Sequence, residues 1–176
     1  MINSRLRRFL ICSVSVCCIV FILVISAPSV VAVGWHLTHS RTQQYANYQV
    51  SVPDRFIMLR KSDRIRLIHA KTIASYKLYK FTMIDIQKLS DNVDIVTWEA
   101  AAIRASARNG FKEVKSFNVD TASFSTACIQ RQQDDNLDIM LTVAYCKSSS
   151  GLVTQYFGDQ NDVVSLREIL YNIVQK

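Results

Sequence analysis

An uncharged apolar segment near the N-terminus constrains this chain more than any other feature. Residues 9–34 carry no charged side chain over 26 consecutive positions, and about 20 apolar residues suffice to cross the hydrocarbon core of a bilayer. Arg5, Arg7 and Arg8 precede the segment, and cationic flanks of this kind stay on the cytoplasmic side. The sequence therefore predicts a cytoplasmic tail over residues 1–8 and a transmembrane signal anchor over residues 9–34.

This topology predicts where the rest of the chain resides. We expect a single-pass inner (cytoplasmic) membrane protein with its N-terminus in the cytoplasm and its folded part in the periplasm or another extracytoplasmic space. A cleaved signal peptide with a small-residue site near residues 30–32 is the alternative, because secretory signals share this arrangement. Both alternatives place residues 35–176 on the far side of the membrane.

The cysteines agree with an oxidising compartment. Three of the five lie in the apolar segment, and the remaining pair is Cys128 and Cys146. Two cysteines are the number needed for one disulfide. A bond between them closes a loop that stabilises the fold by about 3 kcal/mol in the chain-entropy model. Neither belongs to a C-x-x-C motif, so we predict a structural disulfide, with free thiols as the alternative.

The remaining pattern predicts one α+β domain. Residues 35–47 are polar and favour a juxtamembrane linker or short helix, and residues 48–176 form the domain. Two helices are indicated by helical periodicity, one starting at Asp91 or Asp94 and ending before Gly110, the other starting after Asp162. Alternation predicts strands over residues 48–52, 55–60, 64–69, 72–86, 111–119, 124–132, 137–147 and 152–157. We therefore expect an N-terminal transmembrane helix followed by a mainly antiparallel sheet packed with helices, similar to an α/β/α sandwich.

A resemblance to a known family supports this layout. Residues 48–56 read YQVSVPDRF, which resembles the first strand of PsbP-like domains, small extracytoplasmic α/β/α sandwiches. The strands at 124–157 and the helix at 163–174 follow the same order of elements. The resemblance implies a non-enzymatic accessory or binding domain and supplies no catalytic residue. A second resemblance, to bitopic inner-membrane subunits of type IV secretion machines, rests on architecture alone.

The residues that usually carry catalysis do not assemble in the sequence. His36 and His39 lie three positions apart without a third metal ligand. His69 ends a basic strand, and we expect it to be a solvated or hydrogen-bonded surface histidine. Glu99 beside Trp98 is best interpreted as a solvated helix residue. The chain has no G-x-S-x-G motif, and the acids at 134, 135 and 138 lack EF-hand spacing and fit a turn. We therefore predict no enzyme activity, no catalytic residue, no metal and no cofactor.

Basic residues form the strongest functional feature. Residues 41–80 hold nine lysines and arginines against Asp54 and Asp63. We predict that four of them bind an anionic surface such as lipid headgroups, namely Arg60, Lys61, Arg64 and Arg66. We expect no nucleic-acid partner. We expect a membrane-anchored, non-enzymatic accessory subunit that binds other membrane or extracytoplasmic proteins. A lipid- or solute-binding module is the alternative, and a cell-envelope hydrolase is a more distant one.

Overall fold

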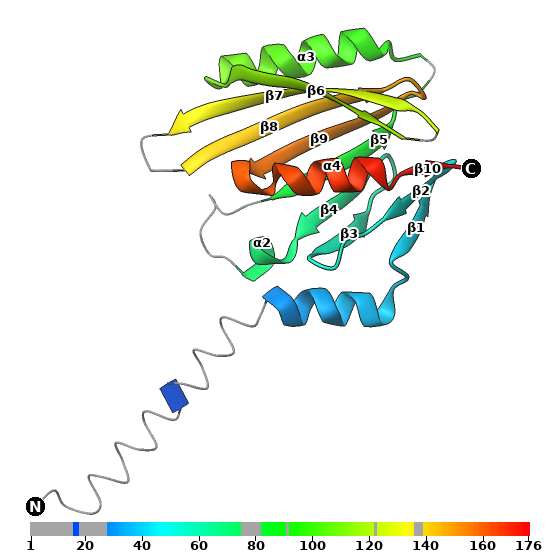
Figure 1. Ribbon diagram of the computed structural model, residues 1–176, viewed down its shortest axis with the longest axis vertical. Coiled ribbons are helices and arrows are strands. Elements are labelled where there is room, and N and C mark those ends of the chain that lie inside the picture. The colour runs from blue at the N-terminus through cyan, green and yellow to red at the C-terminus, as the bar shows by residue number, and fades with distance from the viewer. Residues whose placement is uncertain (1–15, 18–27, 75–81, 91, 122, 136–138) are drawn as a thin grey trace, which may run out of the picture.

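The main sheet of the protein has seven antiparallel strands in the order β3-β4-β5-β9-β8-β7-β6 (Figure 1). The computed structural model describes residues 16–17, 28–74, 82–90, 92–121, 123–135 and 139–176. The strands are β3 (Phe56–Arg60), β4 (Ile65–His69), β5 (Met83–Lys88), β6 (Lys112–Asp120), β7 (Ser125–Asp135), β8 (Ile139–Ser148) and β9 (Leu152–Asp159). The last four strands form a meander, in which strands consecutive in sequence are neighbours in the sheet. The expected strand over 72–86 was wrong at its start, where α2 (Ala70–Ala74) precedes β5.

A second, smaller sheet was not predicted. It contains β1 (Thr42–Tyr45), β2 (Tyr48–Ser51) and β10 (Val174–Gln175) in the order β1-β2-β10. β1 lies in the polar stretch expected to form a linker or short helix, and it pairs with β2 through a turn at Ala46, whose φ is 50°. Its polar sequence TQQY carries little of the apolar alternation by which a strand is recognised.

The larger core lies on the face of the main sheet that is covered by α4 (Val163–Tyr171). A 3-10 turn, η2 (Gln160–Asp162), leads into this helix. Leu166, Ile169 and Leu170 are at most 1% exposed and belong to the same cluster as Ile84 and Tyr156 of the sheet. The helical spacing of its apolar residues therefore serves to cover the sheet.

The opposite face of the sheet carries α3 (Ile95–Arg108), as Figure 1 shows. Asp94 caps this helix by accepting hydrogen bonds from the backbone N–H groups of residues 96 and 97, at 3.2 and 3.1 Å. Gly110 follows the helix with a φ of 81°, the left-handed conformation favoured after a helix C-terminus. Trp98 packs edge-to-face on Tyr145 of β8, with the ring centroids 6.3 Å apart.

The predicted disulfide is confirmed. Cys128 on β7 lies directly opposite Cys146 on β8, and the two sulfur atoms are 2.12 Å apart. The β7–β8 pairing runs without a register shift or bulge. The bulge in this region falls instead between β6 and β7, at Glu113 and Lys115.

The transmembrane prediction requires correction. Within the parts of the chain that the structure describes, every helix is too short or too polar to cross a membrane. Residues 28–34 of the expected anchor belong to a helix over residues 28–38, in which Ala32 is 3% exposed and Trp35 packs against the main core. Residues 9–15 and 18–27 lie outside the described residues.

The fold class and the localisation change accordingly. The apolar residues at the end of the segment were attributed to a bilayer, but this helix uses two of its side chains to pack on the protein itself. The expected N-terminal transmembrane helix, and the single-pass inner-membrane placement with a periplasmic domain, are therefore wrong. The described fold is α+β, with two antiparallel sheets and a few helices.

Candidate functional site

Two of the four predicted anion-binding residues are paired with carboxylates of the protein itself. Arg66 on β4 lies opposite Asp85 on β5 and donates two hydrogen bonds to its carboxylate, both 2.7 Å long. Arg64 donates to Asp63 at 2.6 Å and lies 3.6 Å from Asp85. The hydrogen bond from Arg64 holds the pKa of Asp63 below its usual range. The charges of Arg64 and Arg66 are therefore largely neutralised by carboxylates.

The other two predicted residues keep their charge. Arg60 at the end of β3 donates from Nη2 to the carbonyl oxygen of Gln44 at 2.6 Å. Because a carbonyl is neutral, this bond fixes the guanidinium in place without cancelling its charge. Lys61 is exposed in the turn that follows, where its backbone N–H donates to the carbonyl of Arg64. Lys88, at the end of β5, joins them, although the sequence analysis did not select it.

These three cations border an open depression of about 560 Å³, which we call the basic concavity. Its lining is formed by Tyr45, Ala46, Arg60, Lys61, Ser62, Asp63, Gln87, Lys88 and Ser90. Tyr45 connects the segments below it, since its hydroxyl donates to the carbonyl of Asp63 at 2.7 Å and accepts from the backbone N–H of Lys88 at 3.2 Å. The position of the cations is therefore set by a buried hydrogen-bonded tyrosine.

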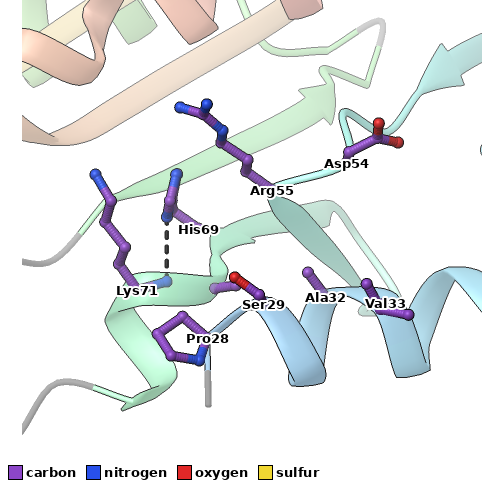
Figure 2. A pocket seen from close by; sticks show the side chains of 9 residues that line it. Pro28, Ser29, Ala32, Val33, Asp54, Arg55, His69 and Lys71 are labelled. Atoms are coloured by element: carbon purple, nitrogen blue, oxygen red, sulfur yellow. Dashed lines mark hydrogen bonds between the residues drawn. The ribbon is translucent and has the colours of Figure 1, made fainter. Parts of the chain in front are cut away.

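A second cavity surrounds a residue that the sequence analysis placed at the surface. His69 is only 4% exposed and lines a pocket of about 420 Å³, which we call the His69 pocket (Figure 2). Its imidazole Nδ1 accepts a hydrogen bond from the backbone N–H of Lys71 at 3.1 Å. The lining comprises Pro28, Ser29, Ala32, Val33, Asp54, Arg55, His69, Ala70 and Lys71.

The His69 pocket is formed in part by two segments whose arrangement has no local sequence signal. Residues 28–38 provide one wall of the pocket, and α2 begins immediately after His69. The alternation of β4 indicated that residues 65, 67 and 69 share one face of the strand, and all three are buried. The shared face with residues 65 and 67 could have indicated that His69 is buried. Its place at the end of a basic strand led us instead to expect a solvated side chain.

The other candidates have structural partners. Glu99 is not solvated as expected, because its side chain is 12% exposed and forms an ion pair with Lys147 of β8. His36 donates from Nε2 to the carbonyl of Pro53 at 3.2 Å, and His39 stacks on Trp35 with ring centroids 4.6 Å apart. The described residues contain no group of three or more metal-ligating side chains. Position 138 lies outside the described residues, and the side chains at 134 and 135 are not described.

Comparisons with known proteins add little to this geometry. No family model matches the chain, and no curated protein sequence matches it. Among solved structures, it is similar to the crystal structure of PA94 from Pseudomonas aeruginosa, a protein of unknown function and candidate regulator. The similarity covers 77% of this chain and 96% of that one, at 11% identity and a TM-score of 0.40.

Proposed function

We propose that this protein is a non-enzymatic binding domain that holds an acidic segment of a partner protein in the basic concavity. The observation that carries the proposal is the hydrogen bond from Arg60 to the carbonyl of Gln44, at 2.6 Å. Among the described residues no carboxylate forms a salt bridge with this positioned guanidinium, which lies beside Lys61 and Lys88. Complementary charge is what steers and orients protein partners, and an ordered arginine loses less side-chain entropy on binding than a free one.

The chemistry of the lining favours an acidic peptide over other anionic partners. Lipid binding calls for an apolar cavity, whereas this lining consists mostly of polar and charged side chains. Binding of single-stranded nucleic acid commonly uses exposed aromatic rings on which bases stack. Tyr45 is the aromatic residue in the lining, and this residue is only 9% exposed. Carboxylates spaced along a flexible segment can pair with cations that come from separate strand ends.

The lining also supports a binding role over catalysis. Asp63 is the carboxylate that borders the concavity, and its hydrogen bonds from Arg64 keep its pKa low. A carboxyl group with a lowered pKa stays ionised near neutral pH and is therefore a poor general acid and a weak general base. The Asp63 carboxylate instead holds the guanidinium of Arg64 in place through these hydrogen bonds.

A charge-reversal pair tests the proposal. The double variant Lys61→Glu/Lys88→Glu changes the concavity, and Lys112→Glu/Lys115→Glu makes the same change in net charge on the exposed strand β6. We would measure the fluorescence anisotropy of a labelled Glu/Asp-rich peptide at physiological ionic strength. We expect the first variant to bind at least about tenfold more weakly, equivalent to about 1.4 kcal/mol, and the second to bind like the wild type. Equal losses in both variants would show that attraction depends on net charge alone, and the proposal would be wrong.

A further inference from the structure

The hydrogen bond at Nδ1 determines how the His69 ring is protonated. Since Nδ1 accepts the backbone N–H of Lys71 at 3.1 Å, the neutral ring carries its proton on Nε2. Burial lowers the pKa of His69, and the charges of Lys71 and Arg55 act in the same direction, against the opposing charge of Asp162 on η2. At neutral pH the ring is therefore uncharged, and Nε2 is a hydrogen-bond donor.

Within the described part of the chain, the His69 ring forms one hydrogen bond, which is the bond that Nδ1 accepts. The Nε2–H group has no hydrogen-bond acceptor there. His69 as a whole residue is 4% exposed and lines the His69 pocket. Among the described residues, Nε2 is not one of the fully buried side-chain atoms that lack a partner, so this donor can be reached from outside the protein. The pocket therefore offers one preoriented N–H group to an acceptor from outside.

Two cations accompany the donor. Arg55 and Lys71 line the same pocket, and Figure 2 shows their side chains extending toward the same side as the free nitrogen of the His69 ring. Neither forms a salt bridge with any carboxylate among the described residues. Asp54, which also lines the pocket, is 3.1 Å from Arg41. Asp162 accepts a hydrogen bond from the hydroxyl of Thr82 at 2.7 Å.

We infer that the His69 pocket binds a small organic oxyanion, with its carboxylate or phosphate group held by Nε2–H of His69, the guanidinium of Arg55 and the ammonium of Lys71. Charge-assisted hydrogen bonds from such groups are the usual means of holding an oxyanion. Pro28, Ala32 and Val33, on the helix over residues 28–38, line the side of the pocket away from the free nitrogen of the His69 ring (Figure 2). This site is separate from the basic concavity, with which it shares no lining residue.

Nuclear magnetic resonance of the full-length protein tests the site directly. Inorganic phosphate and acetate, each at constant ionic strength against sodium chloride, are titrated at neutral pH while the ring nitrogens of His69 are followed by their proton–nitrogen correlations. We expect the free protein to show the proton on Nε2, and a saturable shift of that resonance with at least one anion. A response to phosphate alone would identify a phosphate-bearing ligand, and a response to acetate alone would identify a carboxylic acid.

Variants distinguish binding at this site from nonspecific electrostatic attraction of anions to the protein. Arg55→Gln and Lys71→Gln alter exposed side chains, so folding is expected to be preserved. Together they should weaken binding at least tenfold, as expected for lost charge-assisted hydrogen bonds. The variant Lys61→Glu/Lys88→Glu should retain wild-type affinity, so failure of the proposed peptide site leaves this result interpretable. The inference is overturned if neither anion acts differently from chloride, if Nδ1 carries the proton, or if the Arg55/Lys71 variant binds like the wild type.

Discussion

Arg66 and Asp85 face each other across strands β4 and β5 and are joined by two hydrogen bonds of 2.7 Å, one from Nε and one from Nη2. The carboxylate side chain is 8% exposed and that of the arginine 25%. Because Asp85 also lies 3.6 Å from Arg64, one buried acid balances two cations of the predicted basic cluster. The pair therefore explains why that cluster does not act as a uniformly charged surface.

Removing this acid should destabilise the fold. The substitution Asp85→Ala leaves Arg66 partly buried without its carboxylate, and we expect the free energy of unfolding to fall by about 2–3 kcal/mol. The matched control is Asp54→Ala, which breaks the pair with Arg41, in which both side chains are about 70% exposed. That change should cost less than about 1 kcal/mol. Urea denaturation followed by circular dichroism measures both, and equal costs would contradict our assignment of Asp85 as a structural acid.

The disulfide should contribute to stability through the unfolded chain. It closes a sequence separation of 18 residues, for which the chain-entropy model gives about 3 kcal/mol. The variant Cys128→Ala/Cys146→Ala should lose about that amount in urea denaturation. Because both cysteines are at most 2% exposed, dithiothreitol should leave the native protein oxidised and act once urea exposes the bond. Rapid reduction of the native protein, measured by thiol alkylation and mass spectrometry, would contradict this assignment.

The contact between α3 and the sheet can be tested at Trp98. Its ring packs edge-to-face on Tyr145 and joins the smaller core cluster, while remaining partly exposed. We expect Trp98→Ala to lower the free energy of unfolding by about 2–3 kcal/mol, less than for a fully buried aromatic. Val96 on the same helix is 59% exposed, so Val96→Ala should change stability by less than about 0.5 kcal/mol. Similar values for the two variants would contradict the observed orientation of α3.

Replacing two glycines with alanine should change the stability of the fold in opposite directions. Gly110 has a φ of 81°, and an added Cβ would come no closer than 3.7 Å, to Nε2 of Gln133. Gly110→Ala should therefore cost about 1 kcal/mol through backbone strain alone. Gly34 lies within the helix over residues 28–38 with open space around it, so Gly34→Ala should favour that helix by about 0.5–1 kcal/mol. Thermal denaturation compares the two, and a shift in the same direction would contradict one of the assigned conformations.

His69 should make stability depend on pH. Its pKa in the folded protein is lowered below the ordinary 6.5, mainly by burial, so the unfolded chain binds a proton more readily. Its stabilising contribution is complete above about pH 6.5 and is lost as the pH falls toward the folded pKa. Urea denaturation at a series of pH values from 7.5 to 5 measures this slope. We expect His69→Gln to be less stable at pH 7.5 and to show a flatter dependence; an unchanged slope would indicate that other groups cause it.

Local patterns predicted most of the secondary structure. β8 and β9 could be recognised because they are rich in apolar residues, since one face of these strands packs under α4 and the other under α3. The start of α3 could be located because Asp94 has the side chain that a helix N-terminus requires. The small sheet was missed because its strands are short and β1 is polar, so pairing rather than propensity holds them in place.

The candidate sites were harder to predict because they depend on contacts distant in sequence. Arg66 and Asp85 are separated by 19 positions, and their opposition depends on the register of β4 against β5. Lys88 reaches the basic concavity because the hydroxyl of Tyr45 binds its backbone. His69 lines a pocket together with a helix whose apolar residues had been attributed to a bilayer. In each case the composition suggested the chemistry, and the tertiary structure decided which groups remained available.

The strand order has a consequence for the rate at which this protein folds. β3, β4 and β5 follow one another in sequence, as do β6, β7, β8 and β9, so most neighbouring strands can pair by closing short loops. The junction between β5 and β9 is different, since α3 and three strands intervene before the chain returns. Closing that long segment carries the largest loop entropy in the main sheet. We therefore expect the two meanders to form early, and their joining along β5 and β9 to limit the folding rate.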